Sequence, residues 1–246
     1  METDIESLEQ ATLDAVAPQA IETLPGWLLP FDNTTVGRAI SAVPIWHEGV
    51  DPTVIEEIQS RYTQRGHKVQ FRIADVTGLQ RVCHFLWEQG YTPQQPTLTM
   101  IGNVKDWAQA RQGFNAHLSD QPEPNWASVY LSEDFDQEDG ANRVRALSRS
   151  SCLLYAWLCD ESGAMAAGTV SLSHGWASLH GMRTLARVRG RGCASTLIAA
   201  LGEAALQRNI QRCFLQVEEG NASAIRLYRH LGFQTAWRYH YWRKPA

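Results

Sequence analysis

A glycine-rich bend between residues 189 and 194 carries the clearest chemical signal in the chain. It is Arg189-Gly190-Arg191-Gly192-Cys193-Ala194, and it lies between a predicted strand, 177–184, and a helix predicted to begin near Cys193. Two glycines let the backbone approach a ligand closely, and a helix start presents unpaired N–H groups and the positive end of its dipole. The bend is therefore predicted to bind an anion.

Arginines concentrate around this bend. Between residues 183 and 212 there are six arginines and one acid, Glu203, although the whole chain has a formal net charge of −4. Such a local excess of positive charge favours a ligand that bears phosphate groups. The simpler interpretation is a tight turn flanked by solvated arginines. The six are Arg183, Arg187, Arg189, Arg191, Arg208 and Arg212.

Two common nucleotide-binding patterns fit the bend poorly. A P-loop requires Gly-Lys followed by Ser or Thr, which the bend lacks. A dinucleotide-binding fingerprint is imitated by Gly190, Gly192 and Glu218, but Ser195 occupies its third glycine position. Too little chain follows Glu218 for the remaining strands of that fold.

Four elements are predicted from the bend onward, in the order helix, strand, helix, strand. The first helix covers 193–208 and the next strand 213–217. The second helix covers 222–231, with Asn221 placed to cap its start and Gly232 to end it. Phe233 then opens a strand rich in aromatic residues.

The same order occurs earlier in the chain, with a helix at 54–65, a strand at 69–73 and a helix at 79–89. Gly90-Tyr91 lies 142 positions before Gly232-Phe233, and Arg65 lies 143 before Arg208. So constant an offset predicts a duplicated unit.

Hairpins predicted at 153–170 and 170–179 add antiparallel pairs to the helix–strand repeats. The expected fold class is therefore α/β, of the mixed α+β kind, with two related units. Each unit is expected to be a mixed, mostly antiparallel twisted sheet flanked by helices. The expected division is an N-terminal helical extension at 1–26, a first unit at 27–103 and a second at 104–246.

With these elements in place, the chain resembles the GNAT superfamily of acyl-CoA-dependent N-acyltransferases. The signature of that family is Arg or Gln, two residues, Gly, one residue, and Gly or Ala; Arg189, Gly192 and Ala194 match it. The family's later pattern is a strand, an Asn-capped helix with a tyrosine, and Leu-Gly-Phe. Asn221, Tyr228 and 231–233 match it, so the resemblance covers residues near 150 to 243.

The first unit resembles a degenerate copy, which implies a tandem GNAT arrangement. Its counterpart of the bend, 46–52, has neither the arginines nor the glycine pair. We expect this copy to bind no cofactor.

The resemblance implies acetyl-CoA as the acyl donor, with no metal. Backbone amides of 190–194 would hold the CoA pyrophosphate, with Arg189 and Arg191 nearby. Main-chain groups of 182–184 would pair with the pantetheine and the acetyl carbonyl. The implied cofactor-binding residues are Met182, Arg183, Thr184, Arg189, Gly190, Arg191, Gly192, Cys193, Ala194, Asn221 and Tyr228.

A nearby proton donor speeds release of the departing thiolate, and a base or a chain of water molecules has to deprotonate the amine. Tyr228 matches the donor of the family, although its spacing fits core packing on a helix equally well. The candidate bases are His180, Glu218 and Glu219, and the sequence does not decide between them. Asn221 fits a helix cap that also touches the pantetheine arm.

The expected acceptor is a primary amine of a small molecule or amino-acid-like compound, to which the acetyl group passes by direct transfer. The alternatives are a peptide or protein amine and a non-catalytic acyl-CoA sensor. Five acids within 133–139 could steer a cationic amine or form a solvated loop. Five tryptophans could line a pocket or pack in the core, namely Trp27, Trp46, Trp126, Trp176 and Trp237.

The composition of the chain argues against several other classes of protein. The negative net charge argues against general nucleic-acid binding, and apolar runs such as 195–201 are too short to cross a membrane. The first 26 residues hold no Lys or Arg, unlike a signal peptide, so a cytoplasmic location is expected. Five cysteines fit neither a disulfide framework nor a zinc site and are expected to be reduced. A monomer or homodimer is expected.

Overall fold

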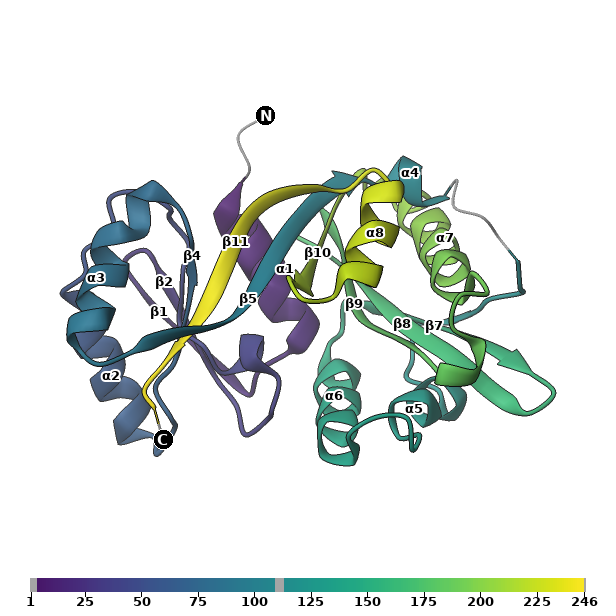
Figure 1. Cartoon of the computed structure of the whole chain (residues 1–246), viewed down its shortest axis with the longest axis horizontal. Helices are drawn as coiled ribbons and strands as arrows, with labels where there is room; N and C mark the ends of the chain where they lie inside the picture. The colour runs from purple at the N-terminus through teal and green to yellow at the C-terminus, as the bar shows by residue number, and fades with distance from the viewer. Residues whose placement is uncertain (1–3, 109–112, 246) are drawn as a thin grey trace.

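The computed structural model of the protein describes residues 4–108 and 113–245. Within these residues the chain forms a three-stranded sheet and an eight-stranded sheet with helices packed around them (Figure 1). The α-helices are α1 (Ile5–Val16), α2 (Val54–Gln64), α3 (Gln80–Glu88), α4 (Val104–Ala108), α5 (Pro124–Tyr130), α6 (Gln137–Arg149), α7 (Cys193–Leu206) and α8 (Ala222–His230). Short 3₁₀ turns are η1 (Gly37–Ala39), η2 (Thr77–Leu79) and η3 (Ala186–Val188).

The strands follow the expected mixture of hairpins and helix–strand repeats. The small sheet has the order β1-β2-β3, and the large sheet has the order β4-β11-β5-β10-β9-β8-β7-β6. The strands are β1 (Ala20–Leu24), β2 (Trp27–Phe31), β3 (Val43–Pro44), β4 (Phe71–Ala74), β5 (Thr92–Asn103), β6 (His117–Ser119), β7 (Leu153–Asp160), β8 (Gly163–Ser173), β9 (Trp176–Thr184), β10 (Arg212–Glu218) and β11 (Gln234–Arg243). The mixed sheet is confirmed, since β9 and β10 are parallel and β7, β8 and β9 are antiparallel neighbours.

The predicted repeat elements are present in both halves of the chain. Helices α2, α3, α7 and α8 each begin and end within two residues of the expected positions. Strand β4 begins at Phe71, two residues later than expected. The last strands, β5 and β11, also lie at corresponding positions of the two repeats.

The two repeats, which are the units expected at 27–103 and 104–246, exchange their last strands. Strand β5 of the first repeat pairs antiparallel with β10 of the second, and β11 of the second pairs antiparallel with β4 of the first. The exchanged strands β5 and β11 also pair with each other and cross the middle of the molecule side by side (Figure 1). The repeats therefore share one continuous sheet.

The N-terminal segment differs from the expected helical extension. Helix α1 is present, with Asp4 as its N-cap, but residues 20–24 form β1, which pairs with β2. The turn between these strands contains Gly26, at φ +78°. The expected boundary at residue 26 therefore falls inside a hairpin. The division at residue 103 remains a prediction, and it coincides with the end of β5.

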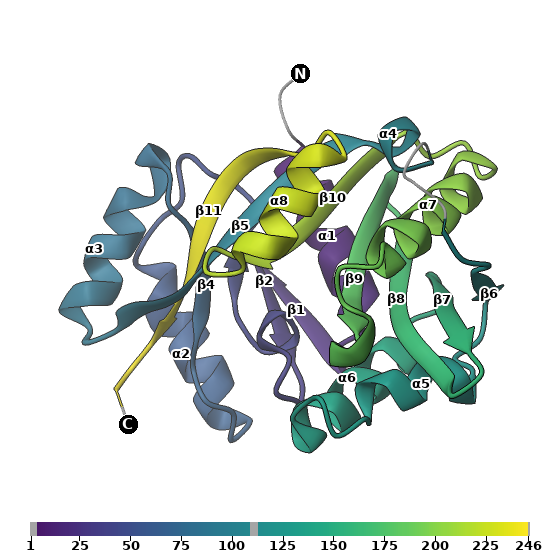
Figure 2. The same ribbon diagram turned by 45° about the vertical axis from the view of Figure 1, so that its right-hand side comes forward.

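Helix α1 lies on the opposite face of the large sheet from α8 (Figure 2). Glu9 on α1 and Arg72 on β4 form a two-point ion pair, with Arg72 Nη1 donating to Glu9 Oε1 at 3.0 Å, and their side chains are only 2% and 1% exposed. Trp176 Nε1 on β9 donates to Ser7 Oγ on α1 at 2.8 Å. Helix α1 thus joins strands that belong to both repeats.

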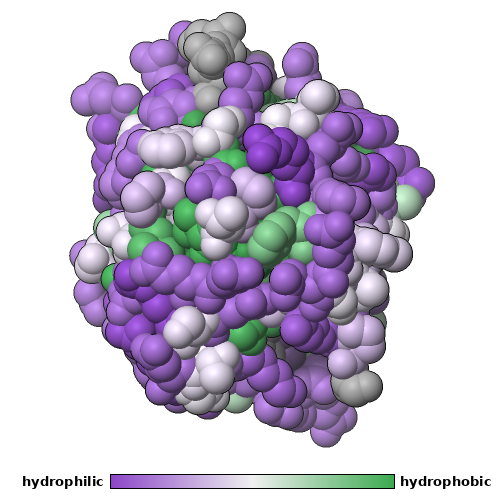
Figure 3. Space-filling model, turned by 90° about the vertical axis from the view of Figure 1, so that its left-hand side faces the viewer, coloured by the Kyte–Doolittle hydropathy of each residue, from purple (hydrophilic) through white to green (hydrophobic). Residues whose placement is uncertain are grey.

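The surface is polar over most of the side that carries α2 and α3, and apolar side chains gather near the middle of that face (Figure 3). No helix within residues 4–108 or 113–245 combines the length and apolar character that crossing a membrane requires. All five cysteines are free, with Cys193 and Cys213 buried and the others partly exposed.

Replacing Glu9 by alanine leaves the Arg72 guanidinium buried without its counter-charge. We expect the Glu9→Ala variant to lose about 3 to 5 kcal/mol of unfolding free energy, measured by urea denaturation. The matched control is Glu6→Ala, at an exposed position of the same helix, which is expected to change stability by less than about 0.5 kcal/mol. Equal losses in the two variants would show that the buried pair does not hold α1 in place.

Candidate functional site

Strands β9 and β10 stop pairing midway along their length. They pair in parallel from Trp176 and Arg212 as far as Leu179 and Leu215. Beyond this point β9 continues to Thr184 and β10 to Glu218, but the two strands no longer pair. The edge of β9 that faces β10 therefore offers backbone groups to a ligand.

A local irregularity in β9 accompanies this parting. Gly181 has φ +62°, and the register between β8 and β9 shifts between the pairs at Ala167 and Thr169. The hydroxyl of Tyr130, on α5, donates to the carbonyl oxygen of Gly181 at 2.6 Å. A Cβ atom at position 181 would lie 2.8 Å from that hydroxyl, so glycine alone fits both the angle and the space.

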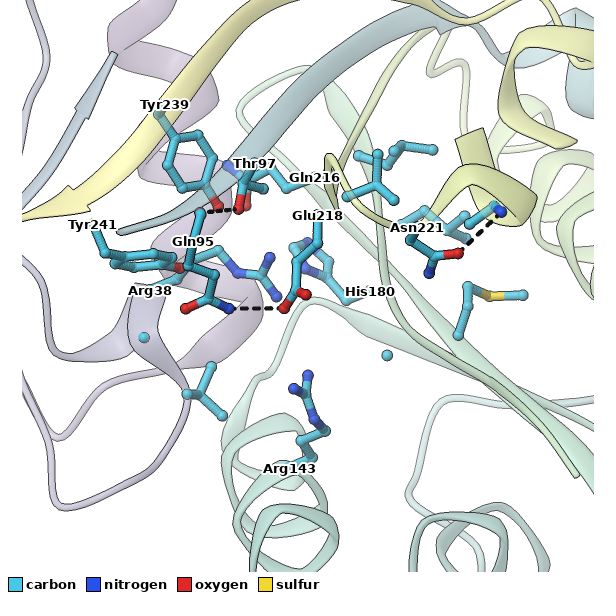
Figure 4. Close-up of a pocket in the computed structure, with 18 of the residues that line it drawn as sticks. Arg38, Gln95, Thr97, Arg143, His180, Gln216, Glu218, Asn221, Tyr239 and Tyr241 are labelled. Carbon is cyan, nitrogen blue, oxygen red and sulfur yellow. Dashed lines mark hydrogen bonds between the residues drawn. The ribbon is translucent and has the colours of Figure 1, made fainter. Parts of the chain in front are cut away.

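A cavity of about 380 Å³ occupies the gap between β9 and β10. It lies where the two repeats meet, because the first repeat supplies part of its wall (Figure 4). The first repeat contributes Thr35, Val36, Gly37, Arg38, Gln95 and Thr97. The rest of the chain contributes Arg143, residues 179–183 and 215–218, Asn221, Ala224, Tyr228, Tyr239, Tyr241 and Arg243.

Six of the predicted site residues line this cavity. They are His180, Met182, Arg183, Glu218, Asn221 and Tyr228. Thr184 and the bend residues 189–194 do not line the cavity. In the sequence they follow the lining residues 179–183 of β9. The individual roles of all these residues remain predictions.

His180 is a buried histidine with one free ring nitrogen. Its Nε2 lies 2.8 Å from Ser178 Oγ, and its Nδ1 is buried without a partner among the described residues. Burial lowers the pKa of His180 well below its usual value, and the positive charge of Arg38 acts in the same direction. The imidazole is therefore neutral at pH 7.

Glu218 and Glu219 differ in their surroundings. Glu218 lies at the end of β10 and accepts a hydrogen bond from Gln95 Nε2 at 2.7 Å, so strand β5 holds it at the cavity (Figure 4). Glu219 does not line the cavity, and its carboxylate lies 3.6 Å from Arg238. Of the two carboxylates, Glu218 is the one placed to meet a substrate.

Tyr228 both packs in the core and lines the cavity, so the two interpretations of this residue are compatible. Its ring meets Phe233 edge to face at 5.8 Å between centroids. Burial raises its pKa to about 12, which keeps the hydroxyl protonated at neutral pH. Asn221 is the predicted helix cap, because its Oδ1 accepts from the backbone N–H of Ala224 at 3.2 Å.

The glycine bend has the geometry that an anion requires. Gly190 and Gly192 have φ of +77° and +87°, and no atom of the described residues lies within 4 Å of a Cβ atom built on either. Helix α7 begins directly after Gly192, none of the side chains in the described part of the chain caps its first amides, and residues 189–192 are exposed. The N–H groups at the start of α7 are open to a ligand.

The arginine cluster is less positive than the sequence alone indicates. Arg183 pairs with Asp139 at 2.9 Å, and Arg187 forms an ion pair with Asp160. Arg212 lies over the ring of Trp176, 4.3 Å from its centroid. Arg189 donates from Nε to the Thr184 carbonyl oxygen at 3.2 Å, which ties the bend to the end of β9.

Four of the five acids in the acidic segment are exposed, in the loop before α6 and at the start of that helix, and some of the acids also bind neighbours. Asp136 caps α6, and the carboxylate of Asp134 accepts from the backbone N–H of Ala186 at 2.7 Å. Asp139 also pairs with Arg143 at 2.7 Å. These contacts hold in place α6 and the segment around Ala186 that precedes the bend.

Tryptophans do not line the cavity, so that hypothesis is wrong. Trp46 is 47% exposed and the other four are buried. The aromatic lining comes from Tyr239 and Tyr241 of β11, besides Tyr228. The alternation of aromatic residues in this strand is a signal that places Tyr239 and Tyr241 on one face.

The counterpart of the bend in the first repeat does not suit an anion. Asp51 Oδ1 accepts from the backbone N–H of Thr53, the residue before α2, at 2.9 Å. Glu56 and Glu57 add two more carboxylates to the first turn of α2. Negative charge already occupies the helix start to which a phosphate would bind.

Two features of this structure are expected of a GNAT fold. One is a parallel strand pair that separates over a cavity, and the other is an open glycine bend at the start of the helix that follows. Known structures agree. Over its whole length the chain is similar to a GCN5-related N-acetyltransferase from Kribbella flavida, with a TM-score of 0.73, 15% identity and 97% of that chain covered. It is also similar to a tandem GNAT protein from the clavulanic acid biosynthesis pathway, with a TM-score of 0.62, 12% identity and coverage of 98% and 95% of the two chains.

Sequence comparisons give the family. A family model described as "Probable histone acetyltransferase Rv0428c C-terminal" matches residues 2–242, and the chain belongs to this family of GNAT N-acetyltransferases. The chain is also 28% identical over 130 residues to the uncharacterized N-acetyltransferase YobR of Bacillus subtilis (strain 168). That match covers 52% of this chain and about half, 53%, of YobR.

Membership of this family implies acetyl-CoA as the donor, and the bend fits the diphosphate of that molecule. The open space at both glycines and the uncapped start of α7 are the features that a diphosphate requires. The unpaired edge of β9 beyond Leu179 leaves backbone groups for an extended pantetheine chain.

An aspartate at position 192 would place its own carboxylate at the start of α7. We expect Gly192→Asp to abolish acetyl-CoA binding in calorimetry, because this carboxylate repels the diphosphate and competes for the same amides. The matched control is Gly66→Asp, since Gly66 has φ +71° and open space around it but lies outside the bend. Unchanged affinity in Gly192→Asp, or equal loss in both variants, would contradict the anion-binding role of the bend.

Proposed function

We propose that the protein transfers an acetyl group from acetyl-CoA to a primary amine of a small, amino-acid-like acceptor by direct transfer. One observation carries the proposal: the cavity between β9 and β10 is lined by a tyrosine that keeps its proton, by a neutral imidazole and by a carboxylate. These are the parts that transfer of an acyl group to an amine requires.

Acetyl-CoA, when bound, supplies an acetyl group that its thioester bond activates. The backbone amides of 190–194, with Arg189 and Arg191, would hold the diphosphate. The main chain of 182–184 would hold the pantetheine arm and orient the acetyl carbonyl. Asn221, fixed as a helix cap beside the cavity, presents its amide to the same arm.

Tyr228 is proposed as the proton donor. Burial raises its pKa to about 12, so the hydroxyl keeps its proton at pH 7 and can donate a hydrogen bond to the sulfur as negative charge develops there. The leaving group is a thiolate whose conjugate thiol has an ordinary pKa, about 8.5, and it can depart without a proton donor. Donation therefore speeds the reaction but is not indispensable.

His180 and Glu218 are the two proposed bases for the amine. An amine acceptor is largely protonated at neutral pH and has to lose a proton before it attacks. His180 is neutral, with a free buried Nδ1, and Glu218 presents a carboxylate at the cavity edge. Either group can take that proton directly or through a water molecule.

A protein amine is the second candidate acceptor, since the matching family carries the description "probable histone acetyltransferase". The cavity favours a small molecule instead, because its volume of about 380 Å³ is that of a small-ligand site and both repeats wall it. A non-catalytic acyl-CoA sensor is the third possibility.

The acceptor class is tested by a thiol-release assay with acetyl-CoA against amino acids, other small amines and histone tail peptides. We expect CoA release only in the presence of a suitable small amine, with a matching acetylated product in mass spectrometry. Release only with peptides would support the protein-directed alternative. Binding of acetyl-CoA without release for any amine would support the sensor.

Removal of the Tyr228 hydroxyl separates donation from packing. We expect Tyr228→Phe to lower kcat by about 10²-fold or more if the hydroxyl acts as a general acid, while the Kd of acetyl-CoA changes little. The control is Tyr62→Phe, which removes another buried hydroxyl, bound to the Pro30 carbonyl oxygen at 2.8 Å and away from this cavity. A kcat equal to that of the unmodified protein would leave Tyr228 with a packing role only.

A further inference from the structure

Arg38 differs from the other charged residues of the cavity. It belongs to η1, in the first repeat, and its guanidinium extends toward the space that His180 and Glu218 share (Figure 4). Among the residues that the structure describes, no carboxylate lies within 4.0 Å of it, and its Nε is buried without a hydrogen-bond partner. A buried donor on a charged group is costly unless something binds it.

The other cavity arginines already have partners. Arg143 and Arg183 both pair with Asp139, at 2.7 and 2.9 Å. Arg243 donates to Gln70 Oε1 at 2.7 Å. Arg38 is therefore the guanidinium that remains available to a ligand in the described part of the cavity.

Two further polar side chains at the cavity lack partners. His180 is only 4% exposed and its Nδ1 is unsatisfied, and the buried amide nitrogen and oxygen of Gln216 are both unsatisfied as well. Both residues line the cavity on the β9 and β10 side (Figure 4). Buried polar atoms are rarely left unpaired, so these atoms indicate a polar ligand in this space.

The charge of the lining indicates the sign of that ligand. Four arginines line the cavity, and Glu218 is the one carboxylate among its described lining residues. Even with Arg143 and Arg183 paired, Arg38 leaves a positive group without a counter-charge. A ligand with an anionic group therefore fits Arg38, and an amine of the same ligand can face the neighbouring His180 and Glu218.

We propose that the acceptor is a small amino acid whose carboxylate is bound by Arg38 while its amine faces His180 and Glu218. This inference rests on the proposed acetyl transfer and specifies its acceptor. A guanidinium suits a carboxylate because its planar N–H groups can donate two parallel hydrogen bonds. The first repeat, which has lost the anion-binding bend, thereby supplies the residue that selects the acceptor.

The same charges disfavour a histone tail. Such tails are rich in Lys and Arg, and an uncompensated guanidinium in the cavity repels a cationic peptide at short range. The proposal therefore separates the two candidate acceptor classes by charge.

The test compares amines that differ only in the carboxylate, in the thiol-release assay with acetyl-CoA. The pairs are tyrosine with tyramine, histidine with histamine, lysine with cadaverine, and phenylalanine with phenylalaninamide. We expect at least one amino acid to exceed its carboxylate-free partner by about 10- to 100-fold in kcat/KM, the loss expected for a hydrogen bond to a charged group.

Variants assign this preference to Arg38. For the best amino acid, Arg38→Gln is expected to raise KM about 10- to 100-fold, with little change for the matched carboxylate-free amine. Arg38→Lys is expected to recover part of the loss because it keeps the charge. The control is Arg81→Gln, an exposed arginine of α3 outside this cavity, which should leave both substrates unaffected.

The possible failures are distinguishable. If no amine of either kind releases CoA, the proposed function fails and the inference fails with it. If carboxylate-free amines, O-phosphoethanolamine or histone peptides outperform every amino acid, acetyl transfer stands and the inference is overturned. Equal effects of Arg38→Gln on an amino acid and on its carboxylate-free partner would also overturn it.

Discussion

The cavity and the free strand edge at the site both depend on the point at which β9 and β10 stop pairing. Parallel strands normally satisfy each other's backbone groups along their whole length, and here the ladder stops after Leu179 and Leu215. The left-handed Gly181 and the hydrogen bond from Tyr130 fix the path of β9 beyond that point. The space that results is both a cavity, which is the proposed acceptor site, and an unpaired strand edge, which is the proposed site of the donor.

The exchange of β5 and β11 determines what surrounds this space. Because β5 pairs with β10, Gln95 from the first repeat reaches Glu218 and holds its carboxylate at the cavity. Because β11 pairs with both β4 and β5, Tyr239 and Tyr241 reach the same cavity beside Gln95 and Thr97 (Figure 4). The first repeat keeps the helix–strand framework without an open anion-binding bend. It supplies part of the cavity wall, including Arg38, which is the proposed binding site of the acceptor.

The sequence predicted the second repeat well because its signals are local. The Asn221 cap, the glycine pair and the 142-residue offset each depend on neighbouring residues or on simple periodicity. Strand exchange could not be predicted, since the offset shows that β5 and β11 are equivalent but not which strand each one joins. Arg38 was missed because it lies in a short 3₁₀ turn with no pattern, and its importance arises only from contacts distant in sequence. The arginine cluster was overestimated because Asp139 and Asp160, which neutralise two of its members, lie outside the segment that was counted.

A crystal structure of the protein with bound CoA tests the central claim most directly. The account predicts diphosphate oxygens at about 2.7 to 3.2 Å from backbone nitrogens at the start of α7, with the pantetheine arm along the unpaired edge of β9 and its sulfur directed toward Tyr228. CoA bound elsewhere, or an empty bend together with restored pairing of β9 and β10 beyond Leu179, would contradict it.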